Sequence, residues 1–230
     1  MRRHRWLIAL PALLVFPAGC GMFQKDAPSS QAGGVPPDAV IEEAPAPKLT
    51  ASTHVAAGKL AESQGRAAAA IDQYRRAIRL EPSNQTAIYH LAMLYSRLGE
   101  HAYAIDAWWH YVSATDGSAS AFTNLAYAQQ LAHQPDEAEA AYRQALKKDP
   151  AYAPAHTNFG MLLAGQGRLD EAASHLGTVM PPAQVHYNLA GVLQQQGNMN
   201  GAREHLSLAV KLNPDFAEAK TRLAGLDLND

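Results

Sequence analysis

The chain has 230 residues, of which 47% are apolar, so it is long enough for one or two domains and apolar enough to build a core. Its 19 basic and 21 acidic side chains give a formal net charge of −2, a balance that does not indicate nucleic acid as a partner. A single cysteine excludes an intrachain disulfide and a cysteine-rich zinc site.

The N-terminal segment has the pattern of an export signal. Three arginines stand within the first five residues, and an apolar run follows from Trp6 to Phe16. That run is shorter than the roughly 20 residues that a helix needs to span a bilayer. A basic start before a short apolar run is typical of a secretory signal peptide. The pattern predicts residues 1–19 as a signal peptide and therefore an exported protein.

The apolar run ends in Pro17-Ala18-Gly19-Cys20, which resembles the lipobox of bacterial lipoproteins. The resemblance implies cleavage before Cys20 and lipid modification of that cysteine, which would anchor the chain stably in a membrane. Gly21 follows instead of aspartate, which by the same resemblance favours the outer membrane, facing the periplasm. Pro17 departs from the aliphatic residue usual there, so the alternative is an ordinary signal peptide with an incidental cysteine.

Residues 20–50 follow the cysteine without any helical or alternating period. Five prolines, a Gly-Gly pair and a Ser-Ser pair interrupt this stretch, which is also rich in alanine. Such composition is typical of a disordered linker. We expect it to act as a tether that holds a folded domain away from the membrane.

From residue 51 onward one pattern recurs. Small and large apolar residues at offsets of zero, four and seven precede a proline at offset twelve, and the helical spacing predicts an all-α structure. Glycines separate the two helices of four units, where each can end a helix with a left-handed turn. Two aspartates stand where second helices begin and are suited to capping them. The recurring residues include Ala70, Tyr74, Ala77 and Pro82, then Ala138, Tyr142, Ala145 and Pro150, then Ala202, Leu206, Ala209 and Pro214; the glycines are Gly65, Gly99, Gly167 and Gly197, and the aspartates are Asp136 and Asp170.

This pattern resembles the tetratricopeptide repeat, a helix–turn–helix unit of 34 residues. The resemblance implies a right-handed superhelical solenoid of about five repeats, in which the first helices line a concave groove and stacked hairpins share one core. It also implies a final helix that covers the end of the stack, with Leu223 and Leu226 inward and Glu218, Lys220 and Arg222 outward. The predicted units are 51–84, 85–118, 119–152, 153–182 (shortened), 183–216 and the capping helix 217–230.

No pattern of catalytic or metal-ligating residues stands out, so the sequence predicts no enzyme, metal site, cofactor or small-molecule substrate. Ten histidines lie along the chain without the spacing of a metal motif. His54, His156 and His186 share one place in three repeats, where the family packs a half-buried side chain. Trp109 should lie on the outer surface, where it is a candidate for contact with a partner.

The candidate binding residues are side chains on the groove side of the first helices. Asn124, Asn158 and Asn188 occupy one place in three repeats, and His90 holds it in another. This row resembles the asparagine ladder of the O-linked N-acetylglucosamine transferase repeat domain, where amides bond the backbone of an extended peptide. The alternative is that each amide bonds neighbouring helix carbonyls or water. The rest of this face is largely neutral, which disfavours the clamp that some repeats use for acidic C-termini: Tyr89, Met93, Thr123, Tyr127, Thr157, Met161 and Tyr187.

These features together predict a membrane-anchored periplasmic scaffold that binds an extended segment of a partner protein. The layout resembles that of pilotin-type and tight-adherence pilus assembly lipoproteins, which implies a role in assembling a pilus or secretion apparatus. One alternative is a chaperone-like adaptor for outer-membrane protein or cytochrome assembly. Another is a regulator that acts on a cell-wall enzyme by contact.

Overall fold

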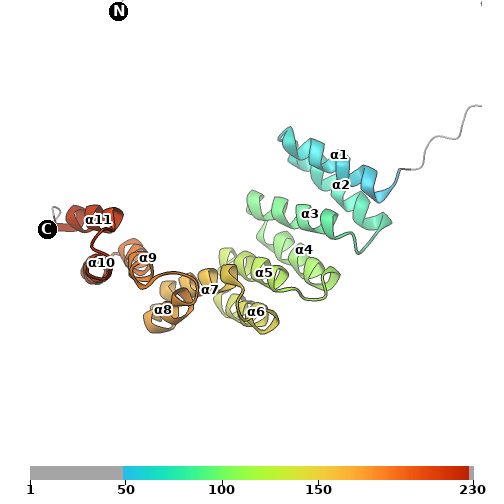
Figure 1. Ribbon diagram of the computed structural model, residues 1–230. Helices are drawn as coiled ribbons and strands as arrows, with labels where there is room; N and C mark the ends of the chain where they lie inside the picture. The colour runs from blue at the N-terminus through green and yellow to red at the C-terminus, as the bar shows by residue number, and fades with distance from the viewer. Residues whose placement is uncertain (1–48, 228–230) are drawn as a thin grey trace, which may run out of the picture. The chain divides into compact units, whose positions relative to one another are not determined.

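Residues 49–227 are described by a computed structural model, and within them the chain forms eleven α-helices and no strand (Figure 1). The all-α repeat fold predicted from the sequence is confirmed. The expectations for the signal peptide, Cys20, the tether and the last three residues lie outside the described residues. In chain order the helices are α1 (Ala51–Ser63), α2 (Ala67–Leu80), α3 (Gln85–Leu98), α4 (His101–Ala114), α5 (Ala119–Leu131), α6 (Pro135–Lys148), α7 (Ala153–Gly165), α8 (Leu169–Gly177), α9 (Pro182–Gln195), α10 (Met199–Leu212) and α11 (Ala217–Asp227).

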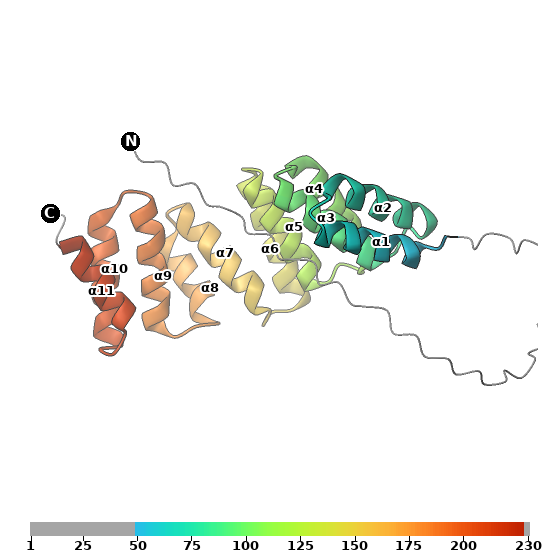
Figure 2. The same ribbon diagram turned by 90° about the horizontal axis from the view of Figure 1, so that it is seen from above.

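The helices pack as hairpins that follow one another along the chain. Helix α1 pairs with α2, and the same pairing recurs up to α9 with α10 (Figure 2). Each hairpin also packs on the next through contacts such as α2 with α3 and α4 with α5, and α11 packs on α10. Helix α5 also contacts α7, and α7 contacts α9, so first helices of successive hairpins adjoin. No helix of residues 49–227 has the length and apolar character needed to cross a membrane.

Small and large apolar side chains alternate in the core at the repeating places. The alanine near the start of each second helix, such as Ala70 or Ala138, is at most 1% exposed, which lets the two helices of a hairpin approach closely. Four residues later a large side chain, such as Tyr74 or Trp108, is also at most 2% exposed. Burying an aromatic side chain of this size stabilises the fold by roughly 1.5–3 kcal/mol. Each hairpin therefore needs its neighbour to cover its apolar face.

The turns inside the hairpins use a left-handed residue, as predicted for four of them. Gly65, Gly99, Gly167 and Gly197 have φ between 70° and 79°. In the third hairpin His133 takes the same conformation with φ 58°, although a side chain is disfavoured there. In the sequence, the missing glycine is the one sign of this difference.

The predicted capping role of two aspartates is not what the structure shows. Helix α6 begins after Gln134 and α8 begins after Arg168, and neither helix has a side-chain cap. Asp136 and Asp170 are the second residues of these helices. There a negative charge interacts favourably with the helix dipole without capping an amide.

The fourth hairpin is short in its second helix. Helix α8 has nine residues, against 14 in α6 and in α10. The chain turns after Gly177, and Pro181 precedes α9, which starts with a second proline at its first position. Pro182 fits there because the first amide of a helix has no partner within the helix. Because α8 ends at Gly177, a short connection leads to α9, which packs against α8.

The end of the stack is covered by α11. Ala219 and Leu226 are buried there, and Leu223 packs half-buried against the same cluster. Arg222, expected to point outward, instead lies against α9, where its Nε donates to Gln194 Oε1 at 2.8 Å. Its guanidinium also lies over the ring of Tyr187, with the guanidinium carbon 5.3 Å from the ring centroid. The hydrogen bond and the cation–π contact together hold the long side chain against α9.

Candidate functional site

The candidate binding residues all lie on first helices of hairpins, from α3 to α9. We call this surface the inner face and define it by the residues predicted for the groove. Tyr89 and Tyr127 are 36% and 48% exposed. All other members except Thr123 are half-buried. They are Met93, Asn124, Thr157, Asn158, Met161, Tyr187 and Asn188.

Thr123 is the exception, because its side chain is turned into the protein. It is 3% exposed, and its hydroxyl donates to the carbonyl of Ala119 at 2.8 Å. That bond uses the hydroxyl proton within α5. Thr123 therefore does not offer a contact to a partner, contrary to its place in the repeat pattern.

The three asparagines differ in what they bond. Within residues 49–227 the side-chain amides of Asn124 and Asn158 make no hydrogen bond, although both are half-buried. Asn188 Nδ2 lies 3.1 Å from the Sδ atom of Met180, a weak acceptor. Two amides of the row thus keep a full donor and acceptor set for another chain.

An aromatic cluster covers the inner face at the second hairpin. The ring centroid of Tyr89 lies 5.5 Å from that of Tyr111, 5.6 Å from Trp108 and 5.8 Å from His90. Trp108 is buried, and Tyr89 remains partly exposed. The Tyr111 phenol is protonated at neutral pH and can donate, and burial raises its pKa further. This surface offers aromatic edges and a hydroxyl rather than charge.

A polar network at the first two hairpins was not foreseen. The Glu62 carboxylate accepts from the Tyr74 hydroxyl at 2.7 Å, from Arg97, and lies 3.4 Å from Nδ1 of His90. Burial acts to raise the pKa of Glu62, but the hydrogen bonds from Tyr74 and Arg97 outweigh it and leave the pKa below its usual value. The ionised carboxylate ties α1 to α3 beside the aromatic cluster.

The bond between Glu62 and Tyr74 belongs to a recurring contact at an offset of twelve residues. In the second hairpin Trp108 Nε1 donates to Ser96 Oγ at 3.1 Å. The third hairpin repeats the contact from the Tyr142 hydroxyl to a glutamine, Gln130 Oε1, at 3.2 Å. The polar atoms of these three core side chains are thus satisfied near the end of the first helix. This spacing was visible in the sequence, but the pairing depended on how close the helices lie.

A pocket of about 320 Å³ opens beside Met161. Gln130 from the third hairpin and Gly165 from the fourth also line it, together with His133 from the turn of the third. Its wall combines the amides of Gln130 and Gln166 with the apolar side chains of Pro135, Met161 and Leu162. The pocket adds a depression to the inner face where successive hairpins meet.

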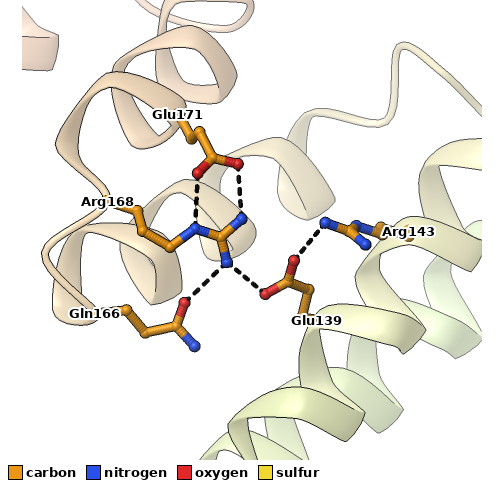
Figure 3. Close-up of polar contacts among 5 residues, drawn as sticks. All are labelled: Glu139, Arg143, Gln166, Arg168 and Glu171. Carbon is orange, nitrogen blue, oxygen red and sulfur yellow. Dashed lines mark hydrogen bonds and ion pairs between the residues drawn. The ribbon is translucent and has the colours of Figure 1, made fainter.

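An ion-pair cluster holds the third and fourth hairpins together (Figure 3). Arg168 donates two bonds to Glu171, at 2.6 and 2.7 Å, and one to Glu139 of α6 at 2.7 Å. Glu139 also accepts from Arg143 at 2.5 Å, and Gln166 receives a further bond from Arg168 at 3.2 Å. The hydrogen bonds from Arg168 lower the pKa of Glu171. The cluster positions the two hairpins that carry Asn124 and Asn158.

The histidines at the shared repeat place are packed, as the sequence predicts. His54 and His156 are buried, and His186 is half-buried. In the part of the chain that the structure describes, no three His, Cys, Asp or Glu side chains are grouped to hold a metal ion. Trp109 lies on the outside, 49% exposed.

Known protein families match the chain over its repeats. Profiles described as "Tetratricopeptide repeat" match residues 130–186 and 183–216, and one described as "TPR repeat" matches residues 58–99. Together these matches cover more than half of the chain. No curated protein matches it.

Several solved structures share the fold. YrrB, described as a TPR protein with an unusual peptide-binding site, is 26% identical with a TM-score of 0.56, covering 75% of this chain and 91% of YrrB. A MamA structure is 19% identical with a TM-score of 0.60, over 73% of this chain and 94% of MamA. A structure of Pseudomonas aeruginosa pilF is 14% identical with a TM-score of 0.56, over 76% and 82%. The last two show the fold alone. The repeat profiles, the hairpin stack and these structures agree that the chain is a tetratricopeptide repeat protein.

Proposed function

We propose that this protein is a scaffold whose inner face binds an extended segment of a partner protein. The observation that carries the proposal is the pair of half-buried amides, Asn124 and Asn158, which make no hydrogen bond within residues 49–227. An amide can donate to a peptide carbonyl and accept from a peptide N–H, so two in successive hairpins can hold a backbone. The peptide-binding site named for YrrB, the relative with 26% identity, supports this assignment.

The inner face also favours a particular kind of segment. Its exposed side chains are Tyr89 and Tyr127, the half-buried Met161 lies on the same face, and the charged Glu62 is already paired with Arg97. Aromatic and thioether surfaces bind apolar side chains. We therefore expect a neutral peptide that presents large apolar residues to Tyr89, Tyr127 and Met161.

The cellular setting is a further part of the proposal. The sequence pattern around Cys20 supports export and lipid anchoring, with the repeats held in the periplasm by the tether. The combination of a lipoprotein signal with these repeats supports a role in assembling a pilus or secretion apparatus. A Cys20→Ser variant should then be released from membranes, whereas carbonate-resistant membrane association of that variant would contradict the anchor.

Binding at the inner face can be tested by photocrosslinking in cells. A photoreactive amino acid at Tyr127 should capture a partner, whereas one at the exposed Gln144 of α6 serves as the control. The double substitution Asn124→Ala and Asn158→Ala should lower the yield from position 127 several-fold without changing the helical circular dichroism signal. An unchanged yield would show that the amides do not bind the partner.

A further inference from the structure

A second pocket lies on the other side of the first helices. It has a volume of about 450 Å³ and is lined by α2, the end of α3 and the start of α4. Each residue advances about 100° around a helix. Tyr95, which lines this pocket, therefore stands about 200° from Met93 of the inner face. We call this depression the outer pocket; a smaller one of about 210 Å³ continues it and shares Arg75, Tyr95 and Tyr103.

Two arginines in the outer pocket have no carboxylate partner. Arg75 and Arg79 are four residues apart on α2, and neither forms an ion pair within residues 49–227. Asp72 also lines the pocket, but its carboxylate is paired with Arg76, whose Nε lies 2.8 Å away. Glu100 lines the pocket without an ion-pair partner among the described residues, and Asp106 lines the smaller depression beside it, so in the outer pocket itself two unpaired arginines face one unpaired carboxylate. An arginine pair with this spacing can bind a carboxylate through charge-assisted hydrogen bonds.

A buried hydroxyl without a partner lies at the same place. Tyr95 is 5% exposed, and in the described residues its hydroxyl makes no hydrogen bond. Its ring carries the guanidinium of Arg75, whose central carbon is 5.9 Å from the ring centroid. A buried polar atom without a partner costs stability. The oxygen is closed to solvent, so a ligand bonds it only after a neighbouring side chain moves, as the exposed Arg75 over the ring can do, and such a ligand then gains from satisfying it.

The rest of the wall is apolar and open to solvent. Leu98 and Tyr103 are 48% and 54% exposed, and the ring of Tyr103 lies 5.3 Å from that of Tyr95. Ile71 completes the wall from α2. Exposed apolar side chains beside unpaired cations suit a ligand that has both an apolar side chain and a negative charge.

We infer that the outer pocket is a binding site for a partner peptide in which a carboxylate stands next to a large apolar residue. Arg75 and Arg79 bind the carboxylate, the Tyr95 hydroxyl donates to it, and the apolar residue packs on Tyr103 and Leu98. The site is distinct from the inner face, which offers neutral amides and aromatic rings. The two faces could therefore hold two different segments at once.

Peptide arrays test this assignment with the full chain. One array carries acetylated hexapeptides with a glutamate flanked by Leu, Ile, Phe or Tyr, and a twin array has glutamine in place of glutamate. The wild-type chain should be retained at least tenfold more strongly by the best glutamate peptides than by their twins. The double variant Arg75→Ala with Arg79→Ala should lose this preference, and Tyr95→Phe should weaken it several-fold. Glu100→Gln should strengthen it, because the opposing charge is removed.

Two controls separate this site from general charge effects and from the inner face. Lys147→Ala with Lys211→Ala removes two exposed cations elsewhere and should keep the preference. Asn124→Ala with Asn158→Ala should also keep it, and a loss there would assign the peptides to the inner face and overturn the proposal. The proposal also fails if wild type shows no preference for glutamate, if the preference survives in the arginine variant, or if the lysine variant loses it equally.

Discussion

The Nδ1 atom of His156 on α7 lies 3.0 Å from the Nδ1 atom of His175 on α8. His156 Nε2 is also 2.9 Å from the carbonyl oxygen of Pro150, which can only accept a hydrogen bond. The proton of His156 therefore sits on Nε2, and its Nδ1 accepts from His175. The next hairpin repeats the contact between His186 and His205 at 3.0 Å.

These pairs predict that the protein loses stability in mild acid. Burial lowers the pKa of His175, His186 and His205, with the neighbouring histidine adding to the effect at His175 and His205, while Glu171 opposes it at His175 and Glu204 at His205. Groups with a lower pKa in the folded state bind more protons when unfolded, so the free energy of unfolding falls as the pH drops below about 6.5. We expect a lower Tm at pH 5.5 than at pH 7.5, measured by circular dichroism.

The first hairpin shows which residue can replace one histidine of such a pair. There His54 Nδ1 lies 2.8 Å from Oε1 of Gln73, at the same offset of 19 residues. The double variant His175→Gln with His205→Gln should fold at pH 7.5 and lose less Tm on acidification than wild type. Glu62 and Glu171 have a pKa below the usual 4.5, so their contribution is lost only at lower pH. An equal fall in Tm for both proteins would contradict the assignment to the pairs.

His133→Gly should stabilise the third hairpin. His133 has φ 58°, a conformation that costs a side-chain-bearing residue about 1–2 kcal/mol, part of which is offset by the greater freedom of glycine when unfolded. We expect a net gain of about 0.5–1 kcal/mol in the free energy of unfolding, measured by urea titration. Gly99→His at the equivalent turn should have the opposite sign. If both changes act in the same direction, the turn conformation is not the cause.

Gly160→Ala should destabilise the fourth hairpin, although alanine favours helices. A Cβ atom there would lie 2.8 Å from Leu176 Cγ and 3.2 Å from the carbonyl oxygen of Ala172. Overpacking of this kind typically costs 1–3 kcal/mol, and the better helix propensity of alanine returns up to about 1 kcal/mol. Gly165→Ala is the control on the same helix, because nothing lies within 4 Å of its Cβ position. Equal urea midpoints for the two variants would show that the helices separate at no cost.

Arg168→Lys should loosen the junction between the third and fourth hairpins. Lysine keeps the charge but cannot bond Glu171 with two parallel N–H groups while also reaching Glu139, as the guanidinium does. We expect a lower Tm at low salt and a smaller difference from wild type at 1 M salt, because exposed ion pairs are screened. Hydrogen exchange should rise in α7 and α8. A Tm difference that does not depend on salt would indicate a loss of packing instead.

The sequence indicates which residues of the site lie at the surface better than it indicates which side chains bond one another. The repeat spacing correctly placed Tyr89 and Tyr127 at the surface of first helices. It failed for Thr123, because a threonine hydroxyl in a helix can bond the carbonyl four residues earlier and turn inward. The ion pair between Glu62 and Arg97 cannot be read from the sequence, because these residues are 35 apart and belong to different repeats.

The sequence alone determined the all-α repeat architecture and where its helices turn. Helical spacing, turn glycines and the recurring small and large residues act within one hairpin, so they can be read along the chain. Only the tertiary structure decided which polar groups are satisfied and which are left for a partner. That outcome depends on side chains from neighbouring hairpins, such as Tyr95 and Arg75, whose meeting is set by how the hairpins stack.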